Sequence, residues 1–320
     1  MSELFFSLVD YRNNYFTSND PNKIIEFYNG FDNREELIQW MKERPKGVAN
    51  IHEVDGDKDI IVVIPTADFN GMYARECREN IFKGLHMVFV ESGGRGDFYF
   101  NIAHNFNVGI RKAMEYNPKW IIYSGDDMIK VDPISKLISE LQKIDNTDVY
   151  TVFTSLGDYH SVPMFLGMPN FLFHNVLKIL NFISKRFSYI EESYFNLRRF
   201  NEQLFFPRYE CGPTLPYKIL NFIFFKKIEN FINTLSFGIF SSNFVIKSDF
   251  KVFDEIYINE MEDTDLSIRI KHMKNNKVFV NFKISEYIGS SLGRGGVRTL
   301  RVVPGWTYFS YKMENGDFDK

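Results

Sequence analysis

The segment that most constrains the fold is the apolar run from Asp59 to Thr66, DIIVVIPT. Its β-branched residues follow one another without polar alternation and lead to a proline, a pattern typical of a strand buried on both faces. Strands of this kind occur in parallel sheets that carry helices on both faces. The run therefore predicts an α/β protein with this strand near the centre of the sheet.

The residues after this run alternate between helical and strand patterns. Helices are predicted at 73–83, 99–116 and 134–144, and strands at 86–90, 120–123 and 149–153. This alternation indicates βαβ units. Right-handed crossovers place the loops that follow such strands at one edge of the sheet, where open α/β sheets bind ligands.

The chain of 320 residues is predicted to have four parts. Residues 1–58 form an N-terminal extension with helices at 22–28 and 33–43, the second capped by Asp32. Residues 59–154 form the alternating half. Residues 155–235 are an aromatic-rich helical insertion, and residues 236–320 return to regular structure as the acceptor half, with a helix at 262–275 and a strand at 277–282.

Composition argues against several classes of protein. A net charge of −3 gives no broad attraction for nucleic acid. Cys77 and Cys211 have no metal-ligand spacing and are expected to be buried thiols. Charged residues interrupt the most apolar stretches, so no spanning helix is expected. The N-terminal residues do not resemble a secretory signal, and a cytoplasmic location is expected.

Two carboxylates, Asp126 and Asp127, directly follow the apolar strand Trp120–Tyr123. Hard oxygen ligands at a strand end suit Mg²⁺ or Mn²⁺ bridging a diphosphate, since the cation offsets the charge of the leaving group. Asp and Gly are also common in turns that end strands. The pair alone therefore leaves both interpretations open.

The order of motifs from Ile61 to Pro133 resembles the donor-binding half of the family 2 glycosyltransferases, which have the GT-A fold. The matching segments are IVVIPT at 61–66, VFVES at 88–92, N-x-G-x-x-x-A at 107–113, and the Asp126-Asp127 strand end. The resemblance implies a mostly parallel central sheet flanked by helices.

The resemblance also implies roles for individual residues. Pro65, Thr66 and Glu91 would lie around the nucleotide base and ribose, and Asn107 would belong to the donor side. Asp127 takes the place of the last Asp of the family's D-x-D motif, with Asp126 beside it. Three departures are visible: Gly125 stands at the first D-x-D position, Glu91 replaces the usual Asp, and residues 285–291 lack the His that often serves as a metal ligand.

A second acidic cluster, from Glu260 to Arg269, resembles the family's acceptor-side motif E-D-x-D-L-x-x-R. Helical spacing pairs Asp265 with Arg269 and puts Glu262 and Asp263 in the first turn, where carboxylates are favoured. A well-capped acidic helix start accounts for the same pattern. The resemblance implies that Asp263 is the general base and that Glu262 helps to hold the acceptor.

Two further segments have open interpretations. The glycine-rich segment 292–298 carries Arg294 and Arg298, which either close over a diphosphate or belong to a plain solvated loop. The apolar residues of 165–235 either pack into a core or form a surface for a homodimer, for peripheral membrane contact or for a lipid-linked acceptor.

The expected function is an inverting, hexosyltransferase-like glycosyltransferase that uses Mn²⁺ or Mg²⁺. It would move a sugar from a UDP- or GDP-linked donor to a hydroxyl of a glycan, protein or lipid-linked acceptor. One alternative is a non-catalytic binding protein on a GT-A fold. Another is a sugar-nucleotide pyrophosphorylase, but the segment Thr66–Gly71 lacks the arginine expected after the first strand of that class.

Overall fold

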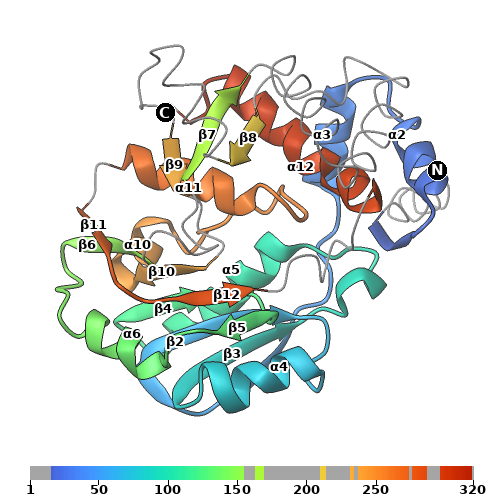
Figure 1. Cartoon of the computed structure of the whole chain (residues 1–320). Coiled ribbons are helices and arrows are strands. Elements are labelled where there is room, and N and C mark those ends of the chain that lie inside the picture. The colour runs from blue at the N-terminus through green and yellow to red at the C-terminus, as the bar shows by residue number, and fades with distance from the viewer. Residues whose placement is uncertain are drawn as a thin grey trace, which may run out of the picture.

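The computed structural model describes residues 16–154, 163–168, 210–213, 231–233, 237–273, 276–286 and 296–318. At its centre is a seven-stranded sheet with the strand order β1-β3-β2-β4-β10-β6-β11 (Figure 1). The bounds of these strands are, in that order, Asn50–Val54, Leu85–Glu91, Asp57–Thr66, Trp120–Tyr123, Gly238–Ser241, Val149–Phe153 and Asn276–Phe279.

The sheet is mixed. Strand β2 is parallel to both β3 and β4, and β11 is parallel to β6. Strand β10 is antiparallel to β4 and β6, and β1 is antiparallel to β3. The prediction of a mostly parallel sheet is thus corrected to a partly parallel one. The two reversed strands lie outside the βαβ alternation of residues 59–154, so no helical crossover imposes a parallel direction on them.

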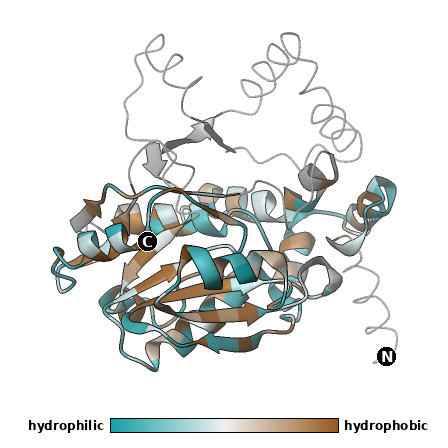
Figure 2. Cartoon of the chain, turned by 60° about the horizontal axis from the view of Figure 1, so that its bottom comes forward, coloured by the Kyte–Doolittle hydropathy of each residue, from teal (hydrophilic) through white to brown (hydrophobic). Residues whose placement is uncertain are grey.

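Helices cover both faces of this sheet (Figure 1). On one face lie α4 (Met72–Glu76), the π-helical turn η1 (Cys77–Ile81) and α6 (Ile134–Leu141), together with a small sheet of β5 (Met128–Lys130) and β12 (Ile284–Glu286). On the other lie α5 (Ile102–Met114), α10 (Ser242–Lys247) and α11 (Glu262–His272). Figure 2 shows that the central strands are among the most hydrophobic segments, as a sheet covered on both faces requires.

A further helical layer packs outside α5 and α11. It contains α2 (Pro21–Tyr28), α3 (Arg34–Glu43) and α12 (Gly296–Glu314), whose apolar side chains form one cluster with Phe100, Tyr257 and Ile268. Helices from the N-terminal and C-terminal parts of the described chain therefore pack against each other in this layer (Figure 1). Residues of the predicted N-terminal extension thus contribute both to this layer and, through β1, to the central sheet.

Most predicted elements of the alternating half are present. Strands β4 and β6 have the predicted bounds, whereas the helix predicted at 73–83 divides into α4 and η1. Asn33, not Asp32, caps α3 by accepting a hydrogen bond from the backbone of Glu36. Of the predicted helical insertion, the structure describes only strands: β7 (Pro163–Met168), β8 (Glu210–Pro213) and β9 (Phe231–Asn233). Among the described helices, none has the length and apolar character needed to cross a bilayer.

Candidate functional site

The connections of the sheet reverse direction between β2 and β4. From β2 the chain passes to β3 on one side, whereas from β4 it continues to β6 on the other. The carboxyl ends of the two strands flanking such a switch point border the crevice in which open α/β sheets bind ligands. Thr66 ends β2, and the backbone N–H of Ser124, just after β4, donates to the carbonyl of Val63 at 3.1 Å. The predicted carboxylates therefore follow β4 directly at this crevice.

A hydrogen bond joins the two strand ends across the crevice. The Thr66 hydroxyl donates to Asp126 Oδ2 at 2.7 Å, and the Cys77 thiol donates to the Asp126 carbonyl at 3.3 Å. Burial raises the pKa of Asp126 to about 6; the Thr66 hydrogen bond acts against this shift, and the charge of Asp127 adds to it. Cys77 is a free, buried cysteine as expected, and burial raises its pKa far above the ordinary thiol value.

Asp127 lies beside Asp126, and its carboxylate extends back over Gly125. A Cβ atom placed on Gly125 would be 2.8 Å from Asp127 Oδ1. Within the described ranges, no group of three or more His, Cys, Asp and Glu side chains has the geometry of a metal site. Mg²⁺ in nucleotide sites is commonly held by one or two carboxylates together with substrate phosphates and water. The Asp126–Asp127 pair fits a cation of that kind, which would complete its shell from a bound diphosphate.

Glu91 ends β3, next to the end of β2. Its Oε1 accepts a hydrogen bond from the backbone N–H of Phe69 at 3.0 Å, and its Oε2 accepts one from His52 Nε2 at 2.8 Å. These two hydrogen bonds lower the pKa of Glu91, the Phe69 bond contributing most. Glu91 is therefore held as an ionised acceptor near Thr66.

The sequence interpretation missed the group that positions Glu91. The His52 ring stacks on Phe69 with centroids 4.4 Å apart and planes inclined by 7°, and the Arg78 guanidinium lies 4.3 Å from the centroid of the same ring. Arg78 also donates to the Phe69 carbonyl. His52 belongs to β1, a half-exposed edge strand without an apolar run, so only the folded sheet brings it to this site.

The predicted catalytic pair lies at the start of α11. Glu260 and Met261, just before the helix, both have positive φ angles, 95° and 73°. Positive φ is strained for such residues, and strain of this kind is concentrated at functional sites. Asp263 Oδ1 accepts hydrogen bonds from the backbone N–H and the hydroxyl of Thr264, at 2.6 and 3.3 Å.

Both side chains of this pair are partly buried. Burial raises the pKa of Glu262 well above its ordinary value, and the adjacent Asp263 carboxylate adds to the shift. Burial also raises the pKa of Asp263, although hydrogen bonds from Thr264 act against it. Glu262 Oε2 is buried and has no hydrogen-bond partner in the described part of the protein. The pair is thus suited to hold and release a proton.

Asp265, two residues along, has a different environment. It is fully buried and accepts hydrogen bonds from Arg269 Nε at 2.7 Å, Tyr257 Oη at 3.1 Å and Lys312 Nζ at 2.5 Å. The predicted ion pair between Asp265 and Arg269 is present. With three donors on its oxygens, Asp265 anchors α11 to α12.

Asn107 has structural contacts rather than an open donor-binding position. Its side chain is fully buried, donates to the Phe253 carbonyl at 2.8 Å and to Glu255 Oε1 at 2.9 Å, and accepts from the Phe253 N–H at 3.0 Å. These bonds fix the segment 252–255 to α5. We therefore leave Asn107 out of the proposed donor site.

The remaining predicted residues are placed as follows. Pro65 is buried within β2, and Arg298 lies in helix α12 instead of the predicted loop, while Arg294 lies outside the described residues. Comparison of the chain with protein-family models, with curated proteins and with solved structures finds no match. The functional assignment consequently depends on the residues and their geometry.

Proposed function

We propose that this protein is a glycosyltransferase that moves a sugar from a nucleotide-diphosphate donor to an acceptor hydroxyl. The observation that carries the proposal is the 2.7 Å hydrogen bond between Thr66 and Asp126. It connects the ends of β2 and β4 at the switch point of the sheet, beside a second carboxylate on Asp127. A paired-carboxylate crevice of this kind suits a cation and a diphosphate.

On the donor side, Asp126 and Asp127 would hold a Mn²⁺ or Mg²⁺ ion. Such an ion neutralises the charge that develops on a leaving diphosphate. Glu91, kept ionised by Phe69 and His52, would accept hydrogen bonds from the hydroxyls of the ribose. Thr66 orients Asp126, so that the carboxylate is fixed before the donor arrives.

On the acceptor side, Asp263 would remove the proton of the attacking hydroxyl. A carboxylate in water is a weak base, and partial burial of Asp263 raises its pKa, which makes it a stronger base. Glu262 lies beside it, so ionisation of both groups at once is disfavoured and the pair would share the proton.

The test of this proposal is thermal denaturation with UDP or GDP, in the presence and absence of Mn²⁺. A ligand that binds the native state raises its melting temperature. We expect stabilisation by one of the nucleotides to require Mn²⁺. We expect Asp127→Asn to weaken that metal-dependent binding by about 10-fold or more, since it removes a charged ligand.

The matched control is Asp55→Asn, which removes a carboxylate that is 93% exposed and precedes β2, at the opposite end of that strand from Thr66. It should bind nucleotide like the wild type. Equal Mn²⁺-dependent affinity in Asp127→Asn and wild type would exclude the metal assignment, and stabilisation by neither nucleotide would exclude the donor site.

A non-catalytic binding protein is the second candidate, favoured by Gly125 at the first D-x-D position and by the absence of His in residues 285–291. It predicts the same nucleotide binding without turnover. Release of free nucleotide diphosphate from a panel of nucleotide sugars, with Mn²⁺ present, distinguishes the two candidates.

A further inference from the structure

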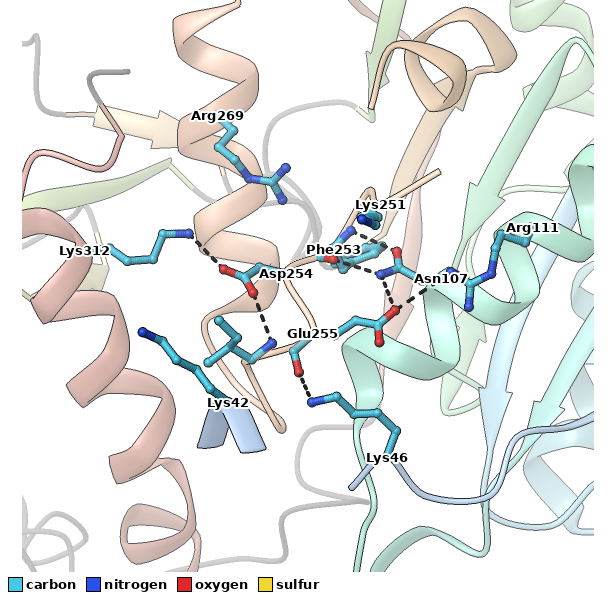
Figure 3. Close-up of a pocket in the computed structure, with 11 residues that line it drawn as sticks. Lys42, Lys46, Asn107, Arg111, Lys251, Phe253, Asp254, Glu255, Arg269 and Lys312 are labelled. Atoms are coloured by element: carbon cyan, nitrogen blue, oxygen red, sulfur yellow. Dashed lines mark hydrogen bonds and ion pairs between the residues drawn. The ribbon is translucent and has the colours of Figure 1, made fainter. Parts of the chain in front are cut away.

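A cavity lies on the side of α5 that faces the helical layers. Its volume is about 500 Å³, and its wall comes from α3 and the residues after it, α5, the segment 251–256, α11 and α12 (Figure 3). Six cationic side chains line it, against the two carboxylates of Asp254 and Glu255: Lys42, Lys46, Arg111, Lys251, Arg269 and Lys312. The proposed donor residues are not part of this wall.

Two of the six cationic side chains, Lys312 and Arg269, are already paired with carboxylates. Lys312 donates to Asp254 at 3.1 Å and to Asp265 at 2.5 Å. Arg269 donates to Asp265 and, through Nη2, to the carbonyl of Val252 at 2.6 Å. These contacts hold α11, α12 and the segment 251–256 together.

The other four cations have unused hydrogen-bonding capacity. Lys46 Nζ donates to the backbone carbonyl of Glu255 at 2.6 Å, and Arg111 Nη1 is 3.9 Å from Glu255 Oε1 (Figure 3). The side chains of Lys42 and Lys251 make no hydrogen bond or ion pair within the described part of the chain. Glu255 cannot neutralise all four, since His104 and Asn107 already bond to its oxygens.

The wall of the cavity carries more cations than carboxylates, and a bound anion relieves such an imbalance. Burial lowers the pKa of Lys46, and the charge of Arg44, which lies outside this wall, adds to the shift, while Glu255 and Asp254 act against it. Phosphate has three or more acceptor oxygens, so it can bond several Lys and Arg donors at once. A volume of about 500 Å³ is in the range of small-molecule sites, too small for a folded macromolecule.

We propose that this cavity is a binding site for a small phosphate-bearing anion, held by Lys42, Lys46, Arg111 and Lys251. The bound anion would connect α3, α5 and the segment 251–256, which carry these four side chains. Because Asp254 and Asp265 join the same segment to α11 and α12, occupation of the cavity stabilises the packing of the helical layers on the sheet.

Isothermal titration calorimetry with inorganic tripolyphosphate tests this site. EDTA in every solution prevents metal-dependent binding at Asp126 and Asp127. The test variant is Lys42→Gln/Lys251→Gln, and the matched control is Lys23→Gln/Lys83→Gln, two exposed lysines that do not line the cavity. We expect the test variant to bind tripolyphosphate about 10-fold or more weakly and the control to bind as the wild type does. Asp127→Asn should also bind normally.

Any of the following three results would overturn the proposal. Absence of binding to the wild type, or equal affinity in the wild type and the test variant, means that the cavity holds no phosphate site. Equal weakening in the control variant means that only the overall charge matters. Loss of binding in Asp127→Asn places the tripolyphosphate at the proposed donor site instead.

The folding of the test variant is checked separately by its melting temperature. A value close to that of the wild type shows that its effect on binding is not a folding defect.

Discussion

Asp263 and Asp265 are two residues apart on α11, but their hydrogen-bond partners differ, and so do the roles that we propose for them. Asp265 accepts hydrogen bonds from two cations and a tyrosine, so it serves as an anchor. The side chain of Asp263 accepts hydrogen bonds from Thr264, and burial raises its pKa. Only the second environment is suited to proton transfer.

We predict that Asp263→Asn lowers the turnover number of sugar transfer by about 10²- to 10⁴-fold, the usual contribution of a general base. Donor binding and melting temperature should stay close to the wild-type values, since the amide keeps the shape of the side chain. Steady-state kinetics with the identified donor, together with the nucleotide thermal shift, measure both quantities.

Glu262→Gln is the matched variant for this prediction. It should retain more activity than Asp263→Asn, because Glu262 would hold the acceptor and share the proton but would not itself remove it from the attacking hydroxyl. Near-normal turnover in Asp263→Asn, or loss of activity only in Glu262→Gln, would reverse the assignment.

Glu255 is expected to make the stability of the fold depend on pH. Burial opposes its ionisation, but hydrogen bonds from His104 and Asn107 outweigh burial and lower its pKa to about 2. A carboxyl whose folded pKa is below its unfolded value stabilises the fold above about pH 4.5, and this contribution disappears as the pH falls toward 2. The side chain is 28% exposed, so the full contribution is reduced to about 2 kcal/mol.

We therefore expect Glu255→Gln to lower the free energy of unfolding by about 2 kcal/mol at pH 7, and the difference from wild type to shrink between pH 4.5 and pH 2. Urea denaturation at several pH values measures this. Glu79→Gln, at an exposed position, serves as the control and should follow the wild type throughout. A difference that does not change with pH would mean that ionisation of Glu255 is not what stabilises the fold.

The sequence predicted contacts between near neighbours better than contacts between distant residues. The Asp265–Arg269 pair follows from helical spacing alone. The Thr66–Asp126 bond joins residues 60 positions apart, and the His52–Glu91 bond joins residues 39 positions apart. Thr66, Asp126 and Glu91 were identified as site residues, but their partners depend on strand order, which local patterns do not contain.

At the scale of elements, the packing of α5 on the sheet depends on one close approach. A Cβ atom on Gly109 would be 2.4 Å from Val63 Cγ1 and 2.9 Å from Val90 Cγ2. Glycine is otherwise unfavourable inside a helix, by about 1 kcal/mol relative to alanine. Its position in α5 is thus explained by contact with β2 and β3.

We predict that Gly109→Ala destabilises the protein by about 1 kcal/mol or more, since overpacking costs about 1–3 kcal/mol and the gain in helix propensity offsets only part of it. Chemical denaturation gives the change in the free energy of unfolding. Adding Val63→Ala should recover part of the loss by making room. Gly96→Ala, where a Cβ meets no atom within 4 Å, is the control and should be nearly neutral. Stabilisation by Gly109→Ala would show that helix propensity outweighs the contact.

Elements with a strong local signal were predicted, and elements stabilised by tertiary contacts were not. Strands β4 and β6 are apolar and largely buried, and their bounds match the prediction. Strand β1 is partly exposed at the sheet edge, and β5 has only three residues, so neither has a clear pattern. Helix α12 begins inside the segment 292–298 that was interpreted as a loop, contains Pro304, and is stabilised by packing against α2 and α3.

At the scale of the whole molecule, the sheet is built from segments that are distant in the chain. Strand β10, which follows the aromatic-rich region, lies between β4 and β6 and is antiparallel to both. The sequence indicated the α/β class through its alternation, but strand order depends on which edges remain open after the first units fold. Residues 155–235 thus lie, in the chain, between β6 and β10, which are neighbouring strands of the same sheet.

The last prediction concerns the aromatic-rich residues 155–235. Residues 155–235 are rich in apolar side chains, among them Phe171, Leu172, Phe173, Phe182 and Ile183. These five residues lie outside the described ranges, so the prediction depends on the sequence alone: apolar residues at this density favour self-association or contact with a lipid surface if they are exposed. We expect the full chain to form a homodimer by light scattering or to sediment with liposomes, and Phe171→Ser/Phe182→Ser to reduce that association. Phe98→Ser/Ile246→Ser, at two exposed positions of the described fold, is the control and should leave the association unchanged. A wild-type chain that is monomeric and does not sediment with liposomes would instead mean that the aromatic side chains of residues 155–235 are buried against the chain itself.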